Sequence, residues 1–132
     1  MAKQRTEVLE KTYEVKAEIT VNLAQQDIDD IMVTALEGGI AHWCCHAETV
    51  GNRLGEYASD QISRGGSLVL YDAESSDKWE LTLEKFLNGV KLYLEEGCHV
   101  QVEDNRIDTG DIDANDADCI IQFALFGEAV FS

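Results

Sequence analysis

The feature that most constrains the fold is a strict alternation of apolar and polar side chains near the start of the chain. Every odd position from residue 13 to residue 23 is apolar: Tyr13, Val15, Ala17, Ile19, Val21 and Leu23. The even positions between them carry Glu, Lys, Thr or Asn. A period of two is typical of a strand with one buried face. We therefore expect a strand from Thr12 to Leu23, either central in a sheet or paired in a hairpin.

Three later segments have the three-and-four spacing of amphipathic helices. The first runs from Gln25 to Glu37, behind a poor N-cap at Ala24, and ends at Gly38-Gly39. The other two run from the good N-cap Thr82 to about Glu96, and from a cap at Asp116 to Gly127. Gly89 lies inside the second helix, where we expect it to allow close packing against a neighbouring element.

The remaining segments predict strands, turns and one short helix. Residues 67–72 and 79–81 are expected to pair as a hairpin, and residues 40–50 and 99–102 to be extended. Residues 56–63 suggest a short helix. The sequence thus predicts one α+β domain over residues 1–132, with a flexible N-terminus at 1–10. It would have an antiparallel sheet of about four to five strands with about three helices packed on it.

The charge of the chain argues against binding to nucleic acid or to anionic membranes. The formal net charge is −16, and such a surface repels nucleic acid and anionic membranes while attracting basic partners. There is no signal-like leader and no apolar run of about 18 residues. We therefore expect a cytoplasmic protein whose four cysteines are free thiols. The acidity has two interpretations: an acidic host proteome, or a basic nucleic-acid-binding partner.

No pattern in the sequence indicates catalysis, a cofactor or a metal. GxSxG, HExxH, P-loop and GxGxxG motifs are absent, so we expect no enzymatic activity and no cofactor. Residues 42–46 (HWCCH) contain metal-capable side chains, but no CxxC pair accompanies them. Asp111-x-Asp113-x-Asn115 resembles the start of a calcium loop, yet it lacks the turning glycine and the bidentate glutamate. We expect no metal site.

Two regions are candidate binding sites. The first is residues 103–118, predicted as a loop with seven carboxylates and one arginine. Its expected contacts with a partner are Glu103, Asp104, Asp108, Asp111 and Asp113. The second combines a scarce basic side chain with flexible backbone amides that could cradle a phosphate, and aromatic rings that could stack on a base. Its members are Arg64, Gly65, Gly66, Trp43 and Tyr57.

Four blocks of the chain together resemble a family of small uncharacterised proteins of phages and prophages of Clostridia-like Firmicutes. The blocks are Asp27–Ile40 with Trp43, Glu56–Tyr71, Leu81–Tyr93 and Asp116–Phe131. The resemblance covers most of the chain from about Val21 onward, and Ala24 departs from it, where a serine-type cap is expected. The family has no established activity, but some small accessory phage proteins counter host defences.

These observations lead to three functional hypotheses. In the first, the protein is an anti-CRISPR-type inhibitor that blocks the basic nucleic-acid-binding surface of a host defence nuclease, in the cytoplasm of an infected bacterium. In the second, it is a sponge that sequesters a nucleotide immune signal through the Arg64 region. In the third, it is a structural or regulatory phage accessory protein. The sequence leaves open whether the chain forms a homo-oligomer.

Overall fold

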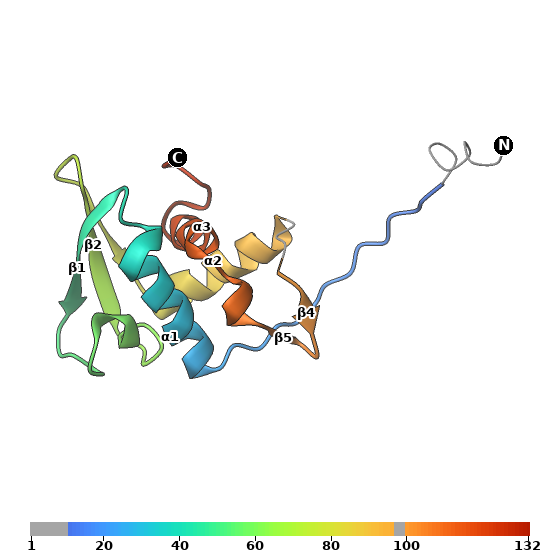
Figure 1. Ribbon diagram of the computed structural model, residues 1–132, viewed down its shortest axis with the longest axis horizontal. Coiled ribbons are helices and arrows are strands. Elements are labelled where there is room, and N and C mark those ends of the chain that lie inside the picture. The colour runs from blue at the N-terminus through green and yellow to red at the C-terminus, as the bar shows by residue number, and fades with distance from the viewer. Residues whose placement is uncertain (1–10, 97–99) are drawn as a thin grey trace.

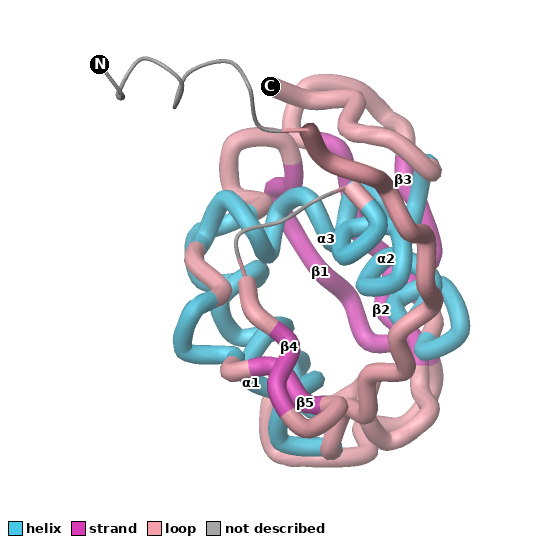
Figure 2. Tube along the Cα trace, turned by 90° about the vertical axis from the view of Figure 1, so that its right-hand side faces the viewer, coloured by secondary structure: helices cyan, strands magenta, loops and turns pink. Residues whose placement is uncertain are grey.

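The computed structural model describes residues 11–96 and 100–132, and its elements form three layers (Figure 1). A three-stranded sheet forms one side of the body, and helices pack against one of its faces. A small two-stranded hairpin lies on the far side of the helices, as Figure 2 shows with the hairpin towards the viewer. The predicted α+β class, with antiparallel strands and three α-helices, is confirmed. The five strands in the described part of the chain belong to two sheets instead of one.

The main sheet has three antiparallel strands in chain order: β1 (Cys44–Val50), β2 (Ser67–Asp72) and β3 (Lys78–Leu81). Leu68 and Leu70 point towards the helices and are fully buried, whereas Val69 and Tyr71 on the opposite face are half-buried. Buried and half-buried side chains thus alternate along β2, because successive side chains of a strand point to opposite faces of the sheet. The predicted hairpin of β2 and β3 is confirmed, and residues 40–50 form a turn followed by the edge strand β1.

Three α-helices cover the sheet: α1 (Gln25–Thr34), α2 (Leu83–Glu95) and α3 (Ala114–Phe126). The predicted cap of α2 is confirmed, because the Thr82 hydroxyl accepts a hydrogen bond from the Lys85 amide at 3.2 Å. The N-cap of α3 is Asp113, not Asp116, since Asp113 and Asp116 accept from each other's amides at 2.9 and 3.0 Å. Gly127 ends α3 in the left-handed conformation, as expected.

The end of α1 differs from a glycine-capped helix. The chain passes directly into a π-helical turn over Ala35–Gly39, and neither Gly38 nor Gly39 has a positive φ. Gly39 is needed for another reason: a Cβ there would lie 2.7 Å from the Ala114 carbonyl oxygen. The glycine therefore lets the π-helical turn pass close to the first turn of α3.

The core lies between the sheet and the helices and is tightest where α2 meets α3. Gly89 of α2 is buried, and a Cβ at this position would overlap the carbonyl oxygen of Ile120. The same atom would lie 2.8 Å from the Cβ of Ala124. The close packing expected at Gly89 is therefore confirmed, and its partner is α3.

The strand predicted from Thr12 to Leu23 is wrong for the isolated chain. Residues 11–24 have no assigned strand or helix, and Figure 1 shows them as an arm that leaves the body. Only Val21 and Leu23 pack against the core, whereas Val15 is 85% exposed. The period-two pattern is present, but no strand in the described residues pairs with it.

The other short elements were predicted only in part. The helix expected over 56–63 is a single 3-10 turn at Ala58–Asp60. The strand expected over 99–102 is β4 (Val102–Glu103), which pairs with β5 (Arg106–Ile107). Residues 97–99 and the predicted flexible segment 1–10 lie outside the described residues. Across the described ranges, no helix has the length and apolar character to cross a membrane.

We predict that Gly89→Ala destabilises the protein by up to about 2 kcal/mol. The added methyl group forces α2 and α3 apart at a cost of roughly 1–3 kcal/mol, and the better helix propensity of alanine recovers about 1 kcal/mol of it. Urea denaturation of both proteins measures the difference. Asn88→Ala, one residue earlier on the exposed face of α2, is the control and should leave stability unchanged or slightly higher. Equal or increased stability of Gly89→Ala would contradict the proposed contact.

Candidate functional site

The acidic segment 103–118 is folded, which corrects the prediction of a plain loop. It contains β4, β5, a 3-10 turn at Thr109–Asp111 and the start of α3. Asp104 and Asn105 link the two strands with φ of 54° and 61°. Both residue types tolerate this left-handed region, and a two-residue turn with two positive φ angles matches the twist of a hairpin. The hairpin therefore holds Asp104 at an exposed tip.

The structure places all five predicted contact residues on this stretch of chain, and all five are exposed: Glu103, Asp104, Asp108, Asp111 and Asp113. The side chain of Asp108 accepts a hydrogen bond from the Gly110 amide at 2.9 Å, which holds the 3-10 turn. Asp113 caps α3. Carboxylates thus follow the chain from the tip of the hairpin to the start of a helix, held by backbone hydrogen bonds.

The first turns of α1 complete this region, a feature that sequence reasoning missed. The Arg106 guanidinium donates to the Asp27 carboxylate at 2.8 Å. The hydroxyl of Thr109 donates to the carboxylate of Asp30 at 3.1 Å. The single arginine of the acidic segment is therefore paired with α1. The three aspartates at the start of α1 were a visible signal, but the partners of Asp27 and Asp30 lie 79 residues away in the sequence.

The alternative site around Arg64 is occupied by internal contacts. Arg64 lies 3.5 Å from the Asp29 carboxylate and donates to the Asp60 carbonyl at 3.1 Å. The amides of Gly65 and Gly66 donate to carbonyl oxygens of the preceding turn at 3.0 and 2.9 Å. A phosphate cradle needs backbone amides that point at the ligand. The geometry therefore offers no support for phosphate binding at this loop.

The two aromatic residues of that alternative lie in different environments. Tyr57 is 62% exposed, whereas Trp43 is only 2% exposed. The Trp43 ring stacks on Phe131 with 5.0 Å between centroids and 5° between planes. Its indole N–H donates to Asp118 at 2.7 Å, and Asp118 also contacts His42 Nε2 at 2.7 Å. Trp43 is thus engaged in holding the C-terminal tail, and a base has no access to its face.

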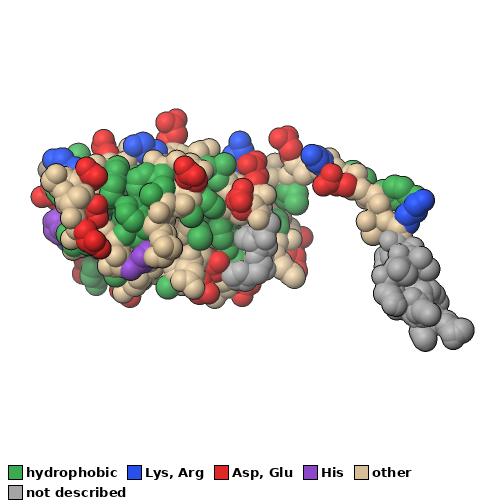
Figure 3. Space-filling view, turned by 90° about the horizontal axis from the view of Figure 1, so that it is seen from above, with side chains coloured by type: hydrophobic (Ala, Val, Ile, Leu, Met, Phe, Trp, Pro, Cys, Tyr) green, Lys and Arg blue, Asp and Glu red, His purple; other side chains and the backbone are tan. Residues whose placement is uncertain are grey.

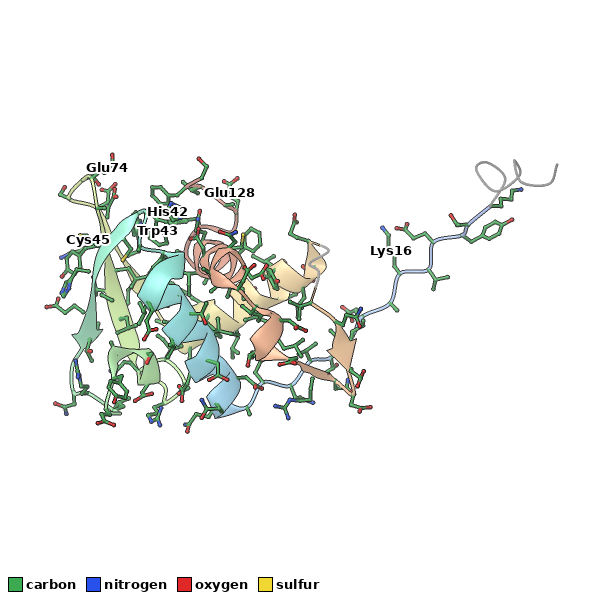
Figure 4. The ribbon with its side chains drawn as sticks, in the orientation of Figure 1. Lys16, His42, Trp43, Cys45, Glu74 and Glu128 are labelled. Atoms are coloured by element: carbon green, nitrogen blue, oxygen red, sulfur yellow. The ribbon has the colours of Figure 1, made fainter. Side chains whose placement is uncertain are left out.

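The cysteine pair at the start of β1 is divided between two environments. Cys44 is buried, and burial raises the pKa of its thiol, so the neutral form is favoured. Cys45 is exposed on the edge strand, near the carbonyl oxygen of Asp72 at 3.6 Å (Figure 4). Within residues 11–96 and 100–132, no three His, Cys, Asp or Glu side chains gather as metal ligands.

Comparisons with protein-family models, with curated proteins and with solved structures find no match for this chain. The resemblance to a phage family therefore remains a prediction. The function must be argued from the charges and contacts described above.

Gln122 of α3 is a buried residue that sequence reasoning overlooked, and it fastens the C-terminal tail. Its side-chain oxygen accepts from the amides of Val130 and Phe131 at 2.7 and 2.8 Å. Its side-chain nitrogen donates to Asp118 at 2.9 Å and to the Phe131 carbonyl at 3.2 Å. Gln122 itself is 1% exposed, so its side-chain amide is satisfied by these protein groups.

We predict that Gln122→Met, which keeps the length of the side chain, lowers the free energy of unfolding by about 2 kcal/mol or more. The reason is that buried partners of the amide lose their hydrogen bonds. Release of Phe131 should also expose Trp43 and shift the tryptophan emission to longer wavelength. Gln26→Met, at an exposed site on α1, is the control and should change neither quantity. Unchanged emission in Gln122→Met would contradict the role of Gln122 in holding the tail.

Proposed function

We propose that this protein is an acidic binding protein whose β4–β5 hairpin and following turn dock onto a basic, nucleic-acid-binding surface of another protein. The observation that supports this most directly is the separation of charges in the acidic segment. Five of its seven carboxylates are exposed, whereas its single arginine is paired with Asp27. The segment therefore presents exposed negative charge on an ordered scaffold.

Ordered carboxylates can compete with phosphates for the same lysines and arginines. Guanidinium groups bind carboxylates and phosphates with similar paired hydrogen bonds. The hairpin and the Asp108 turn are already folded, so little chain ordering opposes docking. The net charge of −16 adds long-range attraction that raises the rate of encounter with a basic partner.

The biological setting comes from the resemblance to phage proteins. In that setting the partner is a host defence nuclease, and the protein acts as an anti-CRISPR-type inhibitor in the bacterial cytoplasm. The contacts of the described residues do not favour the nucleotide-sponge alternative, because Arg64 pairs with Asp29 of α1 and the amides of Gly65 and Gly66 bind within their own loop. If the test below fails, the third hypothesis remains, in which the protein is a phage accessory protein without a defence role.

The test uses purified, guide-loaded CRISPR effector nucleases and measures loss of DNA binding by fluorescence polarisation. We expect inhibition at about 0.1 M salt, where the Debye length is about 10 Å, and a loss of inhibition towards ~1 M, where it is about 3 Å. The double variant Glu103→Gln with Asp104→Asn should weaken inhibition at least about tenfold, because each lost charge-assisted contact costs about 1.5–3 kcal/mol. Asparagine tolerates the positive φ of residue 104, so the hairpin should remain folded.

A matched control separates the local site from the total charge. Glu74→Gln with Glu128→Gln removes the same two charges from the end of the body that carries the β2–β3 turn and the C-terminal tail (Figure 4). Inhibition should persist in this control. Equal weakening in both double variants would contradict the assigned surface, and inhibition that survives high salt would contradict an electrostatic mechanism.

A further inference from the structure

The N-terminal arm has an apolar face that its own chain does not cover. Tyr13, Val15 and Ile19 are 80%, 85% and 68% exposed, and they occupy odd, apolar positions of the alternating segment. Figure 3 shows the arm projecting well beyond the body. Its base is fastened: the Asn22 amide donates to the Asn105 carbonyl at 2.7 Å, and the Asn105 side chain donates to the Thr20 carbonyl at 2.6 Å. A valine or isoleucine left in water forgoes the favourable free energy of burial.

A groove of about 860 Å³ runs beside the base of the arm. One wall is the arm itself over residues 17–23, and the other is the apolar side of α2. Leu87, Val90 and Leu94 line the α2 wall, and Leu87 is 44% exposed. The groove therefore offers an apolar surface next to an extended backbone, which is the arrangement that an added strand fills.

The chemistry of the groove specifies its occupant. An added segment must be extended, must carry apolar side chains at every second position, and must not add negative charge to a strongly acidic body. The arm meets all three conditions. Residues 1–24 contain four basic and four acidic side chains, so the whole charge of −16 belongs to residues 25–132.

The arm cannot fill the groove of its own chain, because its residues 17–23 already form one wall. We propose that the occupant is the arm of a second copy, and that two arms exchange as antiparallel strands around a two-fold axis. Each arm then lies in the groove of the other copy. A two-fold arrangement closes the assembly at a dimer and leaves no free arm.

The sequence of the arm favours a register centred on Ala17. In this register Lys16 lies opposite Glu18 of the second copy, and Val15 lies opposite Ile19. Opposite charges and β-branched pairs across strands are both favourable. Residues 13–21 span about 30 Å as a strand, enough to follow α2, whose 13 residues are about 20 Å long.

Salt dependence distinguishes this dimer from the acidic docking proposed above. Two bodies of charge −16 repel each other, so screening by salt should strengthen dimerisation. The complex with a basic partner should weaken under the same change. The two proposals therefore fail independently.

The test is sedimentation velocity of the full chain over a range of protein and salt concentrations. We expect a monomer–dimer equilibrium that shifts towards the dimer as salt rises. Val15→Asp should raise the dissociation constant at least about tenfold, since burial of one valine is worth more than that factor. The control is Thr12→Asp, which adds the same charge at a polar position of the arm. Thr12 and Val15 are both exposed in the monomer. The control should dimerise like the wild type, apart from a small added repulsion.

A charge exchange tests the register. Lys16→Glu and Glu18→Lys should each weaken the dimer, and the two together should restore it. A chain that stays monomeric at every salt concentration would overturn the proposal. So would a dimer that Val15→Asp leaves intact, or one that dissociates as salt rises.

Discussion

Two aspartates in the first turns of α1 each bind an arginine from another part of the chain. Asp27 and Asp29 are largely buried, and a buried carboxylate without a partner costs several kcal/mol. Arg106 pairs with Asp27, and Arg64 together with the Ser63 hydroxyl contacts Asp29. This removes an arginine from each of the two candidate sites. Arg106 is therefore engaged by α1, and the loop around Arg64 loses the cation that a phosphate would need.

The helix α3 connects most of the remaining structure. Its Ile120 and Ala124 leave room for Gly89 of α2, and its Asp118 and Gln122 hold Trp43 and the C-terminal tail. These contacts combine close packing with fully satisfied buried polar groups, which rigidifies a core more than apolar burial alone. The acidic segment therefore leads directly into a helix that both kinds of contact hold in place.

The alternation in the N-terminal arm illustrates what a sequence pattern states and what it leaves open. Period two states that one side of an extended segment is apolar and suited to burial. It does not state whether the covering surface belongs to the same chain. The prediction of a strand from Thr12 to Leu23 assumed an internal partner, whereas only Val21 and Leu23 find one. The groove along α2 and the neutral charge of the arm suggest that the partner is another copy.

The sequence by itself determined the elements whose signals are local. The hairpin of β2 and β3, the cap at Thr82, the left-handed end at Gly127 and the close contact at Gly89 follow from side-chain period, capping chemistry or the missing Cβ of glycine. It also identified the exposed carboxylates of residues 103–113, because charge density is visible without a fold.

Only the tertiary structure decided the rest, because the deciding contacts join residues distant in sequence. The pairing of Arg106 with Asp27, the stacking of Trp43 under Phe131 and the internal use of Arg64 are of this kind. A charged side chain can bind a partner or ligand only if it is not already paired with a buried group elsewhere in the fold. That requirement separates the acidic segment, whose charges remain exposed, from the arginine loop, whose charge is already paired.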